Sequence, residues 1–271
     1  MTDFLHRTRA LLGQQALETL SRPLVTIAGL GGVGGPAFMT LVRSGVKRFR
    51  LAEQGIFDPP DMNRQWAALG STMDRPKLAV YVEWAKSINP EIEIEEFPEG
   101  LTLENMDAFL LGSDIYIGAI DIDASKELMD RAVIILRKEK IPIFTSVACG
   151  FGTIMLNYDP CGMSPDEFWQ KSAAQADEVS PFLFIAKDVF SHDLLTNIAK
   201  SFEPNKLATC AVGAGQAGLL VASEIIAYIL KDTDYLEREI VFAPSFVILD
   251  LLSMKMEVKS ILDYDPPHDP S

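Results

Sequence analysis

Cysteine is scarce in this chain of 271 residues. The three cysteines, Cys149, Cys161 and Cys210, form no C-x-x-C pair. Because structural zinc sites typically draw on such pairs, we expect no structural zinc. A few unpaired cysteines are also typical of a reducing compartment, so we expect a cytoplasmic protein.

Basic residues are also few, because 24 Lys and Arg face 38 Asp and Glu and give a formal net charge of −14. A nucleic-acid surface needs clustered Lys and Arg, so this balance argues against a nucleic-acid partner. The first residues contain no continuous apolar segment typical of a signal peptide. The most apolar stretch, 217–230, is interrupted by Glu224 and is short for a membrane span, so we expect no membrane partner.

The rest of the chain is arranged around a junction between an apolar run at 24–28 and a helix-forming run at 37–42. The first run is partly β-branched, as is typical of a buried parallel strand. Between the two runs, Gly29, Gly31 and Gly34 spell G-x-G-x-x-G. Glycines at a strand–helix junction permit a tight turn that brings backbone N–H groups and a helix amino terminus to a phosphate. We therefore predict a phosphate-binding turn here, rather than a glycine-rich turn without a ligand.

An acidic residue follows the second predicted strand, residues 47–52. Glu53 lies 24 residues after Gly29. In doubly wound folds, an acidic side chain at this position accepts hydrogen bonds from ribose hydroxyls. We interpret Glu53 as a ribose ligand, and the alternative is a solvated carboxylate at a strand end.

Strands and helices alternate as far as residue 148. This pattern predicts an α/β, Rossmann-like, mostly parallel sheet with helices on both faces. Further strands are expected at 91–97, 115–120 and 141–147, and helices at 3–20, 77–87, 103–111 and 125–139.

The second half of the chain is less regular. A strand at 153–158 is expected to run antiparallel to the others, with a helix at 216–230 and a late strand at 241–249. Residues 159–206 are polar and interrupted by prolines, and we predict an irregular crossover or lid over the carboxyl ends of the strands. We expect one domain over 1–271, made of a nucleotide-binding half (about 1–150), a second half with the lid and a dimer surface (about 151–262) and a tail (263–271).

Gly213, Gly215 and Gly218 spell G-x-G-x-x-G a second time. They run into an Ala- and Gly-rich helix, and no acidic residue follows at the end of a predicted strand with suitable spacing. Small residues in such a helix allow close packing, so we favour helix packing over nucleotide contact.

Two enzyme classes fit the first fifty residues. A nicotinamide oxidoreductase needs a hydride-transfer site, but the chain has no Tyr-x-x-x-Lys pair. It has three histidines, none of them beside a predicted sheet edge: His6, His192 and His268. An ATP-using enzyme needs cations for a triphosphate, and Arg64 and Lys77 follow the ribose strand. Asp121, at the end of a neighbouring strand, can hold magnesium, so ATP is the favoured ligand.

At these positions the chain resembles the ThiF/MoeB/ubiquitin-activating superfamily of adenylating enzymes. The resemblance covers roughly residues 7–158 and rests on motifs in the same order: GQQALETL, GLGGVGG, SGVKRFRLAE, MNRQ, RPKLA, INPEIEI and the Asp121 strand end. It implies that Gly29, Gly31, Gly32 and Gly34 line the phosphates, Glu53 the ribose, and Asn63, Arg64, Gln65 and Lys77 the triphosphate, with Asp121 on magnesium. It also implies a homodimer in which Arg7 reaches the partner's nucleotide and the 216–230 helix lies near the interface.

The chain departs from the family pattern around the phosphates and the metal. Asp61 replaces the usual Asn two positions before the N-R-Q run and would repel phosphate, and Glu53 stands where Asp is usual. Ile122 replaces the Asn of an Asp-Asn pair, for which Asp123 is a candidate substitute. These changes leave nucleotide binding as the expectation and put the rate and the substrate in doubt.

The family resemblance implies ATP- and magnesium-dependent activation of a carboxylate, such as the carboxyl terminus of a peptide or small ubiquitin-like protein, as an acyl-adenylate. Three alternatives stay open: an NAD(P)-binding oxidoreductase, a degenerate nucleotide-binding protein, and a tRNA-modifying cyclising dehydratase, whose branch shares GQQALE and NRQ. A thioester step is not expected. Cys149 is the best-placed thiol, but its local sequence VACGFG offers no cation to lower its pKa.

Overall fold

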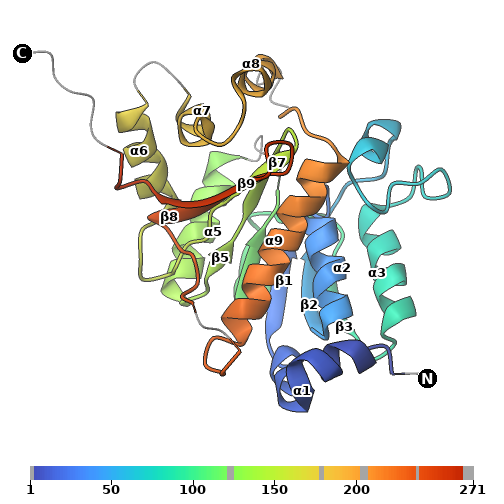
Figure 1. Ribbon diagram of the computed structural model, residues 1–271. Helices are drawn as coiled ribbons and strands as arrows, with labels where there is room; N and C mark the ends of the chain where they lie inside the picture. Colours follow the sequence, from blue (N-terminus) through green and yellow to red (C-terminus); the bar gives the residue numbers. More distant parts are fainter. Residues whose placement is uncertain (1–2, 121–124, 177–179, 202–206, 236–237, 265–271) are drawn as a thin grey trace, which may run out of the picture.

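The structure is a computed structural model that describes residues 3–120, 125–176, 180–201, 207–235 and 238–264. It contains two sheets (Figure 1). The parallel sheet has the order β3-β2-β1-β4-β5, and the antiparallel sheet has the order β6-β7-β8-β9. The parallel strands are β1 (Leu24–Ala28), β2 (Arg48–Ala52), β3 (Glu93–Phe97), β4 (Ile115–Gly118) and β5 (Ile143–Phe144).

Strand β1 lies at the centre of the parallel sheet. It pairs with β2 on one side and with β4 on the other, in parallel register. Four of its five residues are buried, which explains why its sequence is a largely apolar run. Strand order reverses at β1, and ligands of open α/β sheets bind beyond the carboxyl ends of the strands at such a point. The glycine turn, which follows β1, therefore lies at the position in the sheet where ligands of this fold bind.

Helices cover both faces of the parallel sheet, as predicted (Figure 1). One hydrophobic cluster joins the sheet to α2 (Gly34–Ser44), α3 (Lys77–Ile88) and α9 (Ala211–Ile229). The other cluster includes α4 (Met106–Leu110) and α5 (Lys126–Lys138). Residues of the antiparallel sheet belong to both clusters, so the two halves of the chain share each core.

The antiparallel sheet confirms that the later strands reverse direction. Its strands are β6 (Ser146–Cys149), β7 (Gly152–Met155), β8 (Ser245–Asp250) and β9 (Lys255–Ser260). Gly150, with a φ of 54°, makes the tight reversal between β6 and β7. Strand β9 was not predicted from sequence, although Met256 and Val258 alternate with polar residues along it; both apolar side chains are exposed in the structure.

The predicted irregular lid at 159–206 is wrong in its secondary structure. This segment contains three helices, α6 (Pro165–Gln175), α7 (Pro181–Ala186) and α8 (His192–Ser201). Proline interrupts the interior of a helix, but it is favoured in the first turn, where no backbone N–H is needed. Pro165 and Pro181 both occupy that position, and Ser164 caps α6 by accepting a hydrogen bond from the Glu167 N–H.

Helix α9 is the one helix among the described residues that is long and apolar enough to cross a membrane by those two measures. It packs inside the molecule against α2, and a Cβ atom at Gly218 would lie only 2.6 Å from the Val33 carbonyl oxygen. Its charged residue, Glu224, is buried and forms an ion pair with Arg238. These contacts are those of a core helix.

Candidate nucleotide site

The turn between β1 and α2 has glycine where the fold leaves no space for a side chain. Gly29 has a φ of 92°, and a Cβ atom there would overlap the carbonyl group of Ala119, just beyond β4. A Cβ atom at Gly34 would overlap the carbonyl oxygen of Gly29. Backbone packing alone therefore requires these two glycines.

The middle of the same turn is less crowded. Gly31 does not have a left-handed φ, and a Cβ atom there would lie 3.8 Å from its nearest neighbour, Nε2 of Gln65. At Gly32, a Cβ atom would lie 3.2 Å from the Ala214 Cβ and 3.5 Å from the Arg64 Cγ. The fold thus has no steric need for glycine at position 31, whereas close approach of a ligand to the backbone would require it.

Glu53 lies at the carboxyl end of β2, beside the glycine turn. Its carboxylate accepts hydrogen bonds from the Leu30 N–H (2.7 Å) and the Gly55 N–H (2.6 Å). The side chain is therefore held in a fixed position next to the turn, where the predicted ribose would bind. Sequence reasoning did not find that Glu53 also stabilises the turn itself.

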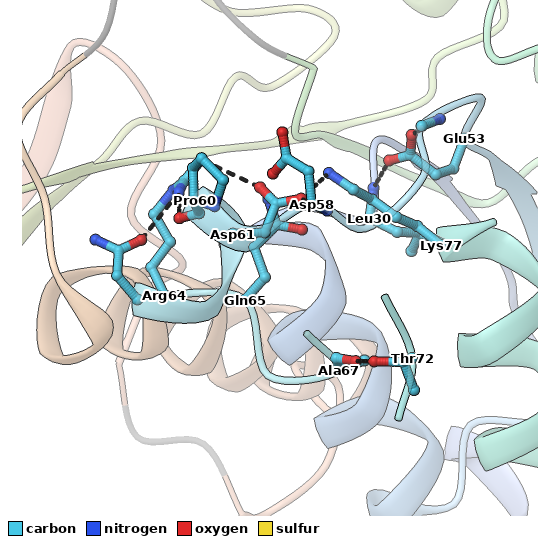
Figure 2. A network of polar contacts seen from close by, with 12 residues as sticks. Leu30, Glu53, Asp58, Pro60, Asp61, Arg64, Gln65, Ala67, Thr72 and Lys77 are labelled. Atoms are coloured by element: carbon cyan, nitrogen blue, oxygen red, sulfur yellow. Dashed lines mark hydrogen bonds and ion pairs between the residues drawn. The ribbon is translucent and has the colours of Figure 1, made fainter. Parts of the chain in front are cut away.

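The N-R-Q run begins at the end of a short 3-10 helix, η1 (Pro59–Asn63), and lies near the glycine turn (Figure 2). Arg64 donates from Nη1 to the Pro60 carbonyl oxygen and to Oδ1 of Asn63, both at 3.0 Å. Asn63 in turn donates to the Thr209 carbonyl oxygen at 3.3 Å, just before α9. These contacts hold the loop between the glycine turn and the start of α9.

Asp61 lies at the centre of this group of polar residues and is only 6% exposed. Its Oδ2 lies 3.0 Å from Nζ of Lys77, and its Oδ1 lies 3.6 Å from Nη2 of Arg64. The Gln65 amide also donates to Oδ1 (Figure 2). From its sequence position, Asp61 is expected only to repel phosphate, but in the structure it forms ion pairs with both predicted triphosphate cations.

Tyr81 is buried beneath the loop. Burial raises the pKa of its hydroxyl above the ordinary range, and the negative charges of Glu53 and Asp61 raise it further. Burial is the main cause of this shift, and the two carboxylates are smaller contributors. Lys77 also lies over the ring of Phe57, 5.7 Å from its centroid.

Two predicted catalytic residues, Arg7 and Asp121, are not seen beside Arg64 and Lys77 in the described part of the structure. Arg7 is on α1 (His6–Leu20), which packs beside Gly45 and Leu230 at the carboxyl-terminal ends of α2 and α9 (Figure 1). The glycine turn is at the opposite end of α2, so Arg7 does not reach the site of its own chain. Asp121, with Ile122 and Asp123, lies outside the described residues. The described part of the chain holds no group of three or more His, Cys, Asp or Glu suited to a metal.

Cys149 is buried at the end of β6. Burial, with a contribution from the charge of Asp250, raises the pKa of its thiol to about 12. A thiol with this pKa stays protonated at neutral pH and is a poor nucleophile. This environment agrees with the expectation that no thioester forms there.

The second glycine set belongs to α9 and has a packing role. A Cβ atom at Gly213 would lie 2.5 Å from the Gly150 carbonyl oxygen, in the β6–β7 turn. At Gly215, a Cβ atom would be in ordinary contact with the Trp66 ring, 3.5 Å from Nε1. Together with Gly218 against α2, these contacts support the packing interpretation.

The sheet is doubly wound, and a glycine turn with charged residues beside it lies at its switch point. These features place the protein in the class of Rossmann-like α/β proteins. Within this class, the chain belongs to the ThiF family, whose model matches residues 5–268. The resemblance inferred from the motifs is thereby confirmed.

Curated relatives match over about half of the chain. Identity to the tRNA threonylcarbamoyladenosine dehydratase of Bacillus subtilis is 35% over 143 residues, covering 52% of this chain and 55% of that protein. Identity to the sulfur carrier protein adenylyltransferase of Thermus thermophilus is 30% over 138 residues, covering 50% of this chain and 51% of that protein. The chain thus spans about half the length of these relatives.

Solved structures share the fold over more of the chain. E. coli MccB with ATP aligns with a TM-score of 0.69 at 15% identity, covering 96% of this chain and 71% of that one. The E. coli tRNA N6-threonylcarbamoyladenosine dehydratase TcdA aligns with a TM-score of 0.59 at 19% identity, covering 84% of this chain and 94% of that one. At these identities, the likeness establishes the fold.

Proposed function

We propose that this chain binds ATP at the glycine turn and activates a carboxylate as an acyl-adenylate. The observation that carries the proposal is Gly31, a glycine that neither backbone conformation nor packing requires. A ligand that approaches the backbone at the amino end of α2 explains it. Membership of the ThiF family and the two cations beside the turn support ATP as that ligand.

In the proposed reaction, a carboxylate oxygen attacks the α-phosphorus, the bond from that phosphorus to the bridging oxygen breaks, and pyrophosphate leaves. No proton has to move, so the chain needs positioned cations rather than a histidine base. Arg64 and Lys77 would stabilise the negative charge that develops on the phosphates, with Asn63 and Gln65 beside them and Glu53 at the ribose.

Magnesium, when bound, would neutralise phosphate charge, and we propose Asp121 as its protein ligand. Magnesium in nucleotide sites commonly relies on one or two carboxylates, together with phosphate oxygens and water.

The proposed substrate is the carboxyl terminus of a peptide or small protein. Relatives named as adenylyltransferases of sulfur carrier proteins, and a structural neighbour solved with MccA, support this class. We further propose a homodimer in which Arg7 acts on the partner's nucleotide, because Arg7 lies far from the site of its own chain.

A tRNA-modifying cyclising dehydratase is the second candidate. The 35% identity to the Bacillus subtilis dehydratase favours it, and the formal net charge of −14 opposes it. An NAD(P) oxidoreductase has less support, because the described site contains cations and carboxylates but no histidine. A degenerate nucleotide-binding protein would bind ATP without turnover.

ATP–pyrophosphate exchange tests the proposal, with a set of peptide carboxyl termini and bulk tRNA as separate candidate substrates. Exchange that depends on a peptide is expected, whereas dependence on tRNA would favour the dehydratase. Lys77→Ala should slow exchange by about 10²–10³-fold, as loss of one group that stabilises transition-state charge does. Lys86→Ala is the matched control, because Lys86 is on the same helix but pairs only weakly with Glu96, at 3.9 Å. ATP binding with no exchange for any substrate would favour the degenerate protein.

A further inference from the structure

The buried carboxylate of Asp61 forms ion pairs with two cations, Arg64 and Lys77. Lys77 is nearly as inaccessible, with its side chain 14% exposed, and the Arg64 side chain is 32% exposed. The Asp58 N–H also points to Oδ2 of Asp61, at 3.4 Å. Asp61 is therefore surrounded by donors, and its charge is compensated within the protein.

The same cations are the ones that the proposed function assigns to the triphosphate. Asp61 lies within hydrogen-bonding distance of Lys77, at 3.0 Å, and interacts with Arg64, at 3.6 Å, through charge alone. A phosphate that binds here must compete with a carboxylate that is already in place and cannot diffuse away. Breaking such a buried pair without a replacement leaves an uncompensated charge, which is strongly unfavourable.

One hydrogen-bonding atom of this group has no partner. Oε1 of Gln65 is buried and forms no hydrogen bond among the described residues, although its Nε2 donates to Asp61. Gln65 is 6% exposed and lies beside Gly31. Gln65 therefore holds a buried acceptor beside Gly31 for which the described residues supply no donor.

We propose that Asp61 is a built-in counter-ion that occupies Arg64 and Lys77 in the free protein and lowers the affinity for those nucleotides whose phosphates need these two cations. This inference rests on the proposed ATP site. A triphosphate carries enough charge to displace a single carboxylate from both cations, whereas AMP engages the glycine turn alone. Asp61 thereby lowers the affinity for ATP most, for ADP less and for AMP least, and so reduces the preference of the site for the triphosphate.

The test compares Asp61→Asn with the wild type in calorimetric titrations of Mg-ATP, Mg-ADP and AMP. Asparagine has nearly the same shape and can still accept from Lys77 and Gln65, but it carries no charge. We expect ATP affinity to rise about tenfold, ADP affinity to rise less, and AMP affinity to stay within about twofold. Inorganic tripolyphosphate, which lacks the nucleoside, should show the same gain as ATP.

Asp58→Asn is the matched control. It removes the same charge from the same loop, and Asp58 is exposed and forms no ion pair with Arg64 or Lys77 among the described residues. An equal rise in ATP affinity in both variants would mean that the loss of any negative charge from this loop is sufficient, and would overturn the proposal. A second check compares Lys77→Gln with the double variant Asp61→Asn/Lys77→Gln. Adding Asp61→Asn to Lys77→Gln should raise ATP affinity less than it does in the wild type, because one of the two cations paired with Asp61 is then missing.

The outcomes separate this inference from the proposed function. Wild-type binding of ATP with no gain in Asp61→Asn overturns the counter-ion role and leaves the ATP site intact. Weaker ATP binding in a folded Asp61→Asn protein also overturns it, because Asp61 would then be a positioning residue for the bound state. If neither protein binds ATP or tripolyphosphate, both the proposed function and this inference are wrong.

Discussion

The pattern G-x-G-x-x-G occurs twice in the chain, and the two copies lie in different structural settings. The copy at 29–34 forms the turn between the central strand β1 and helix α2. The copy at 213–218 lies within α9, where each glycine faces a neighbouring segment. The same spacing therefore serves a turn in one place and helix packing in the other.

The difference lies in what each glycine allows. In α9, Gly213 and Gly218 let backbones approach, and most N–H groups of that helix are paired within it. In the turn, Gly29 and Gly34 allow the chain to fold tightly. Gly31 has room for a Cβ atom in ordinary contact with Gln65, and it lies before the first turn of α2, where a helix has N–H groups without helical partners. Both copies therefore reach a helix amino terminus, since Gly213 is in the first turn of α9, but the Gly150 carbonyl oxygen closes the space at Gly213, whereas Gly31 has no backbone group against it.

Gly34→Ala should cause the largest change. A Cβ atom there overlaps the Gly29 carbonyl oxygen, and no rotamer change can remove that contact. We expect the free energy of unfolding in urea to fall by about 3 kcal/mol or more, at the upper end of overpacking effects. A fall of less than about 1 kcal/mol would mean that the turn is not built as described.

Gly218→Ala should be the next largest change. The new methyl group would lie 2.6 Å from the Val33 carbonyl oxygen and would push α9 away from α2. A loss of about 1–3 kcal/mol in unfolding free energy is expected, since a helix can shift where a tight turn cannot. Urea denaturation measures it, and an unchanged midpoint would contradict the close packing of these helices.

Gly31→Ala and Gly215→Ala compare the middle glycines of the two copies directly. Neither Cβ atom meets a neighbour closer than 3.5 Å, so both variants should be as stable as the wild type or up to about 1 kcal/mol more stable. Gly31→Ala should weaken ATP binding at least about tenfold, or roughly 1.4 kcal/mol, because a methyl group then separates phosphate from backbone. Gly215→Ala should leave the affinity unchanged, and equal effects of the two variants on calorimetric affinity would refute the distinction.

Cys149→Ala should have the smallest effect on chemistry. Cys149 precedes the β6–β7 turn on which Gly213 packs, and its pKa of about 12 keeps the thiol neutral across the working pH range. Pyrophosphate exchange should keep its wild-type rate, as it should in the control Cys161→Ala, which changes an exposed cysteine. Loss of exchange in Cys149→Ala alone, with the fold intact, would show that the thiol takes part.

Much of the first half of the chain, about residues 1–150, could be predicted from sequence because its elements have strong local patterns. Three patterns indicate one parallel sheet: the apolar strand at Leu24–Ala28, Glu53 at the end of the neighbouring strand, and the alternation of strands and helices. The segment with α6, α7 and α8 could not be predicted in the same way, because Pro165 and Pro181 mark helix starts as readily as loops.

The candidate site was predictable in composition but not in its internal contacts. Spacing indicated that Glu53, Arg64 and Lys77 belong near one crevice, and the structure places them around the glycine turn and the η1 loop. That Asp61 is buried between both cations could not be inferred, because a sequence does not show which charges face one another in space. The role of Arg7 on a partner subunit stays a prediction.

Calorimetric titration of the wild-type protein with Mg-ATP and, separately, with NAD tests the central claim most directly. The glycine turn with Arg64 and Lys77 beside it predicts saturable Mg-ATP binding to one site per chain and no measurable heat with NAD. Saturable binding of NAD without any Mg-ATP signal would contradict the account and would place the chain with the nicotinamide oxidoreductases.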